Sequence, residues 1–216
     1  MIRLFVFDLD GTLVDSLRDL SDSANTLLVS CGGAPIEMAA VGRMVGEGAA
    51  TLVARVFAAA VVPQPADALE RFLAIYDTKL LNCTRAYEGI PDALAAIADR
   101  ATLAVLTNKP LIATRRILDG LNLSRFFETG SVLGGDGPVA RKPDPAALRT
   151  LCERAGVSTS DTMMVGDSLI DWETAKNAGA GICLARYGFG FREFPQERLN
   201  GRETLIDSPA GLLTLV

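Results

Sequence analysis

Histidine is missing from all 216 residues of the sequence. It supplies the base of the Ser-His-Asp type of catalytic triad, so that triad is excluded outright. Any acid–base chemistry must therefore be carried out by carboxylates or lysine.

Cysteine is scarce and scattered. Cys31, Cys83, Cys152 and Cys183 form none of the close pairs of a zinc site, and they lack the density of a disulfide scaffold. We expect four buried thiols. The remaining composition is that of an ordinary globular protein, 49% hydrophobic and 22% charged, with enough length for one large domain or for a domain with an insertion.

Long apolar runs and basic runs are also missing. The apolar stretch 49–62 is interrupted by Arg55, and no stretch reaches the ~18 to 20 apolar residues of a membrane span. Twenty-one basic and twenty-six acidic residues give a net charge of −5, without the basic patch of a nucleic-acid-binding protein. No cleavable signal precedes the first apolar run. We expect a cytoplasmic protein with neither a nucleic-acid nor a membrane partner.

Short apolar runs that suit buried strands alternate with helical patterns from residue 87 onward, and a further such run opens the chain. This alternation is typical of right-handed βαβ crossovers. It predicts an α/β fold with a doubly wound, Rossmann-like parallel sheet. The strands are expected at 4–7, 102–106, 128–133, 163–165 and 181–184. The helices of this part are expected at 91–99, 111–121, 145–155 and 169–178, with one short helix within 201–216.

Residues 15–86 have a different pattern. Apolar residues recur there at helical spacing, and no strand signal interrupts them. Helices are expected at 15–29, 38–45, 48–62 and 66–81. The sequence therefore predicts a core of 1–14 and 87–216, with a helical domain of 15–86 inserted between the first two strands.

Two carboxylates follow the first strand. Asp8 comes at its carboxyl end, where open α/β sheets bind their ligands, and Asp10 points to the same side if the chain stays extended. Carboxylates so close repel each other unless a proton or a cation intervenes. Magnesium suits such a pair, because it accepts one or two protein carboxylates together with substrate phosphate. The alternative is an ordinary surface turn, since Gly11 and Thr12 follow directly.

Other strand ends and loops carry further reactive groups, namely Thr107, Lys142, Asp167 and Asp171. Parallel strands present their carboxyl ends at one edge, so these groups can converge. Each also has a structural alternative. Thr107 and Asp167 could cap helices, although Ser168 suits the second cap better. Lys142 could be a solvated loop residue, and Asp171 could complement a helix dipole.

Four motifs in this order resemble the haloacid dehalogenase superfamily, in its phosphatase branch and most closely the phosphoglycolate phosphatases. They are DLDGTLVDS (8–16), LTNKP (106–110), RKPDP (141–145) and VGDSLIDWETAKNAG (165–179). The resemblance implies a magnesium-dependent phosphatase that acts on a small phosphate monoester, phosphoglycolate or similar, through an aspartyl-phosphate. It also implies that the inserted helical domain is a cap that closes over the site.

The resemblance implies a role for each matching residue. Asp8 would be the nucleophile, and Asp10 the general acid and base. Mg²⁺ would bind Asp8, the backbone carbonyl of Asp10, and Asp167, with support from Asp171. Thr107, Asn108 and Lys142 would bind the transferred phosphoryl group.

The segment 41–48 resembles the glycine-bearing cap loop of phosphoglycolate phosphatases. Gly46 and Gly48 could bring backbone N–H groups against a bound anion. Arg43 could pair with a substrate carboxylate, or it could equally be a plain surface arginine. Glu47 stands where relatives often have asparagine, and its negative charge would disfavour an anionic substrate tail.

Two other functions stay open from the sequence. One is a phosphomutase of the same fold acting on a sugar phosphate. The other is a phosphoacceptor or phosphate-binding regulatory domain, which a seventy-residue lid after the acceptor strand disfavours. The protein could be a monomer or a homodimer.

Overall fold

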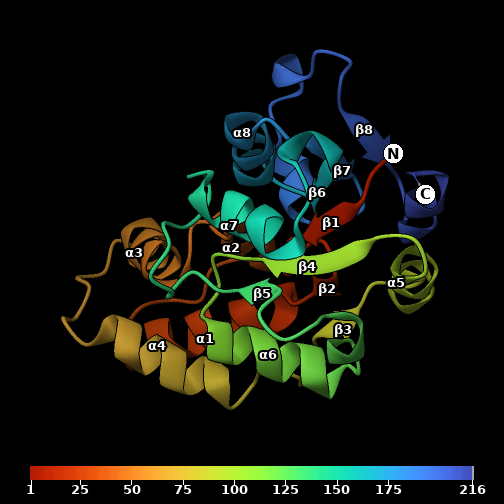
Figure 1. Ribbon diagram of the computed structural model, residues 1–216. Coiled ribbons are helices and arrows are strands. Elements are labelled where there is room, and N and C mark those ends of the chain that lie inside the picture. Colours follow the sequence, from red (N-terminus) through yellow and green to blue (C-terminus); the bar gives the residue numbers. More distant parts are fainter. Residues whose placement is uncertain (216) are drawn as a thin grey trace.

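The centre of the molecule is a six-stranded sheet in the order β5-β4-β1-β6-β7-β8. The computed structural model describes residues 1–215 (Figure 1). Every neighbouring pair in this sheet is parallel, so the predicted parallel sheet is confirmed. The strands are β1 (Leu4–Phe7), β4 (Thr102–Leu106), β5 (Val132–Leu133), β6 (Thr162–Gly166), β7 (Gly181–Ala185) and β8 (Thr204–Ile206).

Helices cover both faces of the sheet. Side chains alternate between the faces along a strand, and in β1 Phe5 and Phe7 belong to one hydrophobic cluster while Leu4 and Val6 belong to the other. The first cluster includes residues of α5 (Ile90–Ala98) and α6 (Leu111–Gly120), and the second includes residues of α7 (Ala146–Ala155) and α8 (Leu169–Ala178). Burial on both faces explains why β1 reads as a continuous apolar run.

A block of helices separates β1 from β4 along the chain and lies to one side of the sheet (Figure 1). Helix α1 packs against α2 and α4, and α3 packs against α4. The hydrophobic cluster on this face of the sheet continues into the block through Leu20, Phe57 and Phe72. The helices are α1 (Leu17–Ser30), α2 (Met38–Gly42), α3 (Ala49–Ala60) and α4 (Ala68–Asp77).

The two connections between the sheet and the helical block pair with each other. Strands β2 (Val14–Asp15) and β3 (Arg85–Ala86) form a small antiparallel pair. The expectation of no strand in 15–86 was therefore wrong at its two ends, where two-residue strands are too short to give a periodic signal. The pair lies at the limits expected for the inserted domain, and the division into a core and an inserted domain stays a prediction.

Asp19 ties the first helix of the block to the second connection. Its carboxylate is buried and accepts hydrogen bonds from the backbone N–H groups of Cys83 and Thr84 and from the Thr84 hydroxyl, at 2.8–3.0 Å. A carboxylate that satisfies otherwise unpaired backbone donors fixes the relative position of two segments.

The last part of the chain differs most from the expectation. The short helix expected in 201–216 is a 3₁₀ helix, η5 (Pro209–Leu215), and β8 before it was not predicted. The strand expected at 128–133 is limited to its last two residues. Cys152 and Cys183 are buried as expected, but Cys31 is partly exposed and Cys83 is exposed.

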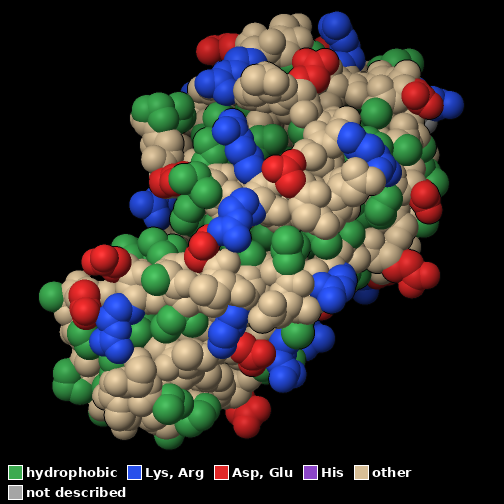
Figure 2. Space-filling model, turned by 90° about the horizontal axis from the view of Figure 1, so that it is seen from below, with side chains coloured by type: hydrophobic (Ala, Val, Ile, Leu, Met, Phe, Trp, Pro, Cys, Tyr) green, Lys and Arg blue, Asp and Glu red, His purple; other side chains and the backbone are tan. Residues whose placement is uncertain are grey.

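The surface is mixed in charge. Figure 2 shows basic and acidic side chains interspersed over the face seen from below, with hydrophobic side chains between them. Within residues 1–215, every helix is too short or too polar to span a bilayer.

Candidate active site

The predicted reactive groups come directly after the central strands. Asp8 follows β1 and Asp167 follows β6, and Thr107 follows β4. The backbone N–H of Asp8 donates to the Val165 carbonyl at 2.8 Å, and that of Thr107 donates to Leu133 at 3.1 Å. These bonds continue the hydrogen-bonding pattern between the strands by one residue. Asp8 and Thr107 therefore lie together at the carboxyl end of the sheet.

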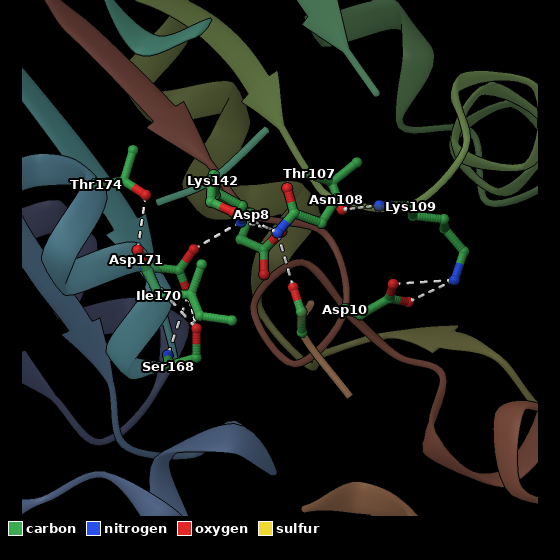
Figure 3. Close-up of polar contacts among 11 residues, drawn as sticks. Asp8, Asp10, Thr107, Asn108, Lys109, Lys142, Ser168, Ile170, Asp171 and Thr174 are labelled. Carbon is green, nitrogen blue, oxygen red and sulfur yellow. Dashed lines mark hydrogen bonds and ion pairs between the residues drawn. The ribbon is translucent and has the colours of Figure 1, made fainter. Parts of the chain in front are cut away.

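Lys142 joins the carboxylates of this edge. Its ammonium nitrogen lies 2.8 Å from Asp8 Oδ1 and 2.6 Å from Asp171 Oδ1 (Figure 3). Burial lowers the pKa of Lys142, but the charges of Asp171 and Asp8 outweigh this effect and raise it above the ordinary value. Lys142 is 4% exposed. The alternative of a solvated loop lysine is therefore wrong.

Three carboxylates gather beside this ammonium group. Ligand oxygens of Asp8, Asp167 and Asp171 all lie within 4.8 Å of one another. The pKa of Asp8 is raised to about 7, chiefly by burial. Lys142 opposes this rise, and the charges of Asp171 and Asp10 add to it. Burial and the charges of Asp171 and Asp8 likewise raise the pKa of Asp167. Buried acids that destabilise one another's charge fit a divalent cation.

Asp171 has its oxygens engaged by other groups. Oδ2 accepts from the backbone N–H of Ser168 at 3.1 Å and from its hydroxyl at 2.6 Å, while Oδ1 faces Lys142. Ser168 is the N-cap of α8 and forms a capping box with Asp171, which confirms the expected cap. Asp171 therefore completes the helix start and orients Lys142, and this leaves Asp8 and Asp167 as the freer oxygen ligands.

Glycines surround Asp167. The backbone N–H of Gly190 donates to Asp167 Oδ2 at 2.7 Å. A Cβ atom on Gly11 would lie 1.9 Å from the same oxygen, and one on Gly188 would lie 2.3 Å from the Asp167 Cβ. Only glycine permits such close approach. No role was predicted for Gly188 and Gly190, because they lie in an irregular loop without any periodic pattern.

Asp10 faces a second lysine. Lys109 Nζ lies 2.9 Å and 3.1 Å from the two Asp10 carboxylate oxygens, and the Ser16 hydroxyl donates to Asp10 Oδ1 at 2.5 Å. Burial lowers the pKa of Lys109, but Asp10 and the neighbouring Tyr76 raise it above its ordinary value. Lys109 was missed at the sequence level. Its only signal was its place inside the motif LTNKP.

Asn108 links three segments of the site. Its side-chain N–H₂ donates to the carbonyls of Lys142 and Gly46, both at 2.9 Å, while its Oδ1 is buried without a hydrogen-bond partner within residues 1–215. The Thr107 hydroxyl accepts from the Lys109 backbone N–H at 3.2 Å. Thr107 thus stabilises the turn after β4 and also borders the site. The alternative of a helix cap is wrong, because the N-cap of α6 is Pro110.

A cavity of about 200 Å³ lies between these strand ends and the helical block. Gly46 and Gly48 line it, and both have positive φ angles; contact of their N–H groups with a bound anion stays a prediction. Arg43 does not reach it: the side chain is exposed and lies outside the set of lining residues. Helix α2 ends at Gly42, so Arg43 starts the turn and faces outward. Glu47 is also exposed and pairs with Arg55, which directs its charge away from the cavity.

Comparison with known proteins identifies the class. The family model of the haloacid dehalogenase-like hydrolases matches residues 2–179. The chain therefore belongs to the haloacid dehalogenase-like hydrolase family. The resemblance drawn from the four motifs and the assignment to the hydrolases are confirmed.

Individual relatives refine this result. The chain is 44% identical over 198 residues to a phosphoglycolate phosphatase of Rhodospirillum rubrum, covering 88% of this chain and 81% of the relative. It is 36% identical to a phosphoglycolate phosphatase of Agrobacterium fabrum, covering 97% and 90% of the two chains. The crystal structure of a predicted phosphoglycolate phosphatase from Haemophilus somnus superposes with a TM-score of 0.90 at 29% identity, covering 99% and 97%.

Proposed function

We propose that the protein is a magnesium-dependent phosphatase that hydrolyses a small phosphate monoester, phosphoglycolate or a similar compound, through an aspartyl-phosphate on Asp8. One observation carries this proposal. A buried lysine bridges Asp8 and Asp171 beside Asp167, and Asp8 and Asp167 line a cavity of about 200 Å³. Ligand pockets for larger, drug-sized molecules start near ~300 Å³, so this cavity suits a small alcohol ester.

In the first step, a carboxylate oxygen of Asp8 attacks phosphorus while the bond from phosphorus to the alcohol oxygen breaks. Asp10 donates its proton to that oxygen, and the alcohol leaves. In the second step, a water molecule attacks phosphorus, gives a proton to Asp10, and displaces the Asp8 carboxylate as inorganic phosphate forms. One carboxylate thus serves as acid and then as base, in a chain without histidine.

The remaining polar groups orient the phosphoryl group. Lys142 holds the Asp8 oxygen in place and offsets negative charge as it develops. Thr107 and Asn108 border the same space and supply hydrogen-bonding groups at the end of β4. Lys109 and Ser16 hold the Asp10 carboxylate beside the leaving oxygen.

Asp8, Asp167 and the backbone carbonyl of Asp10 would hold Mg²⁺, with Asp171 supporting the arrangement through Lys142 and Ser168. Burial chiefly, with the charges of neighbouring carboxylates, raises the pKa of Asp8 and of Asp167, and a cation would stabilise their ionised forms. When bound, the ion neutralises phosphoryl oxygens that the acids would otherwise repel.

We also propose that residues 15–86 act as a cap domain over the site. Asn108 on the core side donates to the Gly46 carbonyl on the other side, and the cavity is lined by residues of both parts. A cap that closes in this way excludes water until the substrate is in place.

The test is release of inorganic phosphate from an aryl phosphate with Mg²⁺. Asp8→Asn keeps the shape of the side chain and should abolish turnover. Asp99→Asn, an exposed position at the end of α5, is the matched control and should retain it. Undiminished turnover by Asp8→Asn would exclude Asp8 as the nucleophile. Isomerised product without free phosphate, from a sugar phosphate, would indicate a phosphomutase instead.

A further inference from the structure

The helical block lines the cavity mainly with apolar side chains. Val45, Leu52, Phe72 and Leu80 contribute to this wall. Asp77 also lines the cavity, but its carboxylate pairs with Arg116 of α6. Among the residues that line the cavity, Lys109 is the only cation.

One polar group on this wall has no partner. The Tyr76 side chain is 4% exposed and stacks on Phe72 at 5.8 Å between ring centroids. Its hydroxyl is buried and forms no well-directed hydrogen bond within the described residues. Burial raises the pKa of Tyr76 to about 12, although the Lys109 ammonium is near enough to oppose this rise, so the hydroxyl keeps its proton at neutral pH. A buried hydroxyl without a partner has an energetic cost that a bound ligand can relieve.

Lys109 connects this hydroxyl-bearing ring with the proposed acid. Its ammonium nitrogen lies 4.6 Å from the centre of the Tyr76 ring. Within residues 1–215 this nitrogen donates two side-chain hydrogen bonds, one to each carboxylate oxygen of Asp10. An ammonium group has three donors. The order along the cavity is therefore Asp8, Asp10, Lys109 and Tyr76.

We propose that Tyr76 and Lys109 form the subsite for the leaving alcohol, and that they select an alcohol bearing an anionic oxygen, such as a carboxylate. This rests on the proposed function. With phosphorus at Asp8 and the ester oxygen at Asp10, the rest of a short alcohol extends toward Lys109 and Tyr76. The subsite takes the role that Arg43 was expected to have.

The test compares three phosphate esters of two-carbon alcohols: 2-phosphoglycolate, 2-hydroxyethyl phosphate and ethyl phosphate. They end in a carboxylate, a hydroxyl and a methyl group. In the wild-type enzyme, KM should increase in that order. Tyr76→Phe should lower the ratio of kcat/KM for 2-phosphoglycolate to that for ethyl phosphate by about tenfold, mainly through KM. Tyr87→Phe removes a hydroxyl from a residue outside the cavity lining and should leave this ratio unchanged.

The outcomes separate the subsite from the phosphatase activity itself. A wild-type enzyme that hydrolyses ethyl phosphate and 2-phosphoglycolate with equal kcat/KM would overturn the subsite and leave the phosphatase intact. Equal losses for both substrates in Tyr76→Phe would show that Tyr76 only supports the fold. Absence of turnover with every monoester would overturn the proposed function, and the subsite with it. If Tyr76→Phe is unstable, the wild-type comparison still tests whether the subsite selects an alcohol with a carboxylate.

Discussion

Asp8→Asn should stabilise the metal-free protein above neutral pH. In the folded state the pKa of Asp8 is raised from 3.8 to about 7, chiefly by burial. The folded protein therefore binds more protons than the unfolded chain between these values, and its stability falls as pH rises through that range. A pKa difference of one corresponds to about 1.36 kcal/mol, so the full effect is at most about 4 kcal/mol.

The variant removes the charge but also removes a partner of Lys142, which retains Asp171. We therefore expect about half of the maximum, a gain of about 2 kcal/mol near pH 8. For a chain of this size the gain corresponds to a rise in Tm of about 4–8 °C. Near pH 4, where Asp8 of the folded protein is protonated, the gain should be close to zero.

The assay is urea unfolding with a chelator at both pH values, with Asp99→Asn as the control for removal of an exposed carboxylate. Added Mg²⁺ should stabilise the wild type more than Asp8→Asn, because binding to the folded state adds stability. A variant that is less stable than the wild type near pH 8, or a difference that does not change with pH, would refute the account of Asp8 as a buried and destabilised charge.

Three further predictions concern other parts of the structure. Asp19→Ala should lower the free energy of unfolding by about 3 kcal/mol in urea titrations, because it leaves buried backbone donors without an acceptor. The control, Asp22→Ala on the same helix, should change this free energy by less than about 1 kcal/mol. Equal losses in the two variants would contradict the role of Asp19. Lys142→Met should lower kcat with an aryl phosphate by about 10²–10³-fold. The control replaces Lys176, an exposed lysine of α8, and Lys176→Met should leave kcat within about twofold of the wild type. Similar rates in the two variants would exclude Lys142 from the site. Gly188→Ala should raise the Mg²⁺ concentration needed for half-maximal activity, because its Cβ would overlap the Asp167 side chain, and an unchanged requirement would argue against the glycine cradle.

The parallel sheet and most site residues could be predicted because they depend on local signals. Strands buried on both faces are apolar throughout, as in 4–7 and 102–106. Polar residues directly after such strands are expected at the carboxyl edge of the sheet, where ligands bind. The same reasoning predicted that Asp8, Lys142 and Asp167 lie at one edge of the sheet, although they are far apart in the chain.

Features set by tertiary packing could not be predicted in this way. Strands β2, β3 and β8 have two or three residues each, too few to show a period of two. The direction of Arg43 depends on where α2 ends and how the following turn packs. The pairing of Lys109 with Asp10 depends on the path of the turn after β4, which no spacing in the sequence specifies.

Buried charge is the common feature of the site. Lys109 and Lys142 each lie against carboxylates in surroundings that disfavour isolated ions. Such pairs contribute little to stability compared with hydrophobic packing of similar volume. Their retention is consistent with a site in which charge is held ready for a phosphoryl group.

In the proposed mechanism, Asp8 carries the phosphoryl group between the two steps. The most direct measurement is mass spectrometry of enzyme quenched in acid during turnover, followed by peptide mapping. We expect a mass gain of about 80 Da, one phosphoryl group, on the peptide that contains Asp8, and none in Asp8→Asn. A phosphoryl group on another residue, or its absence from every peptide while phosphate is being released and the quench preserves aspartyl-phosphate, would contradict it.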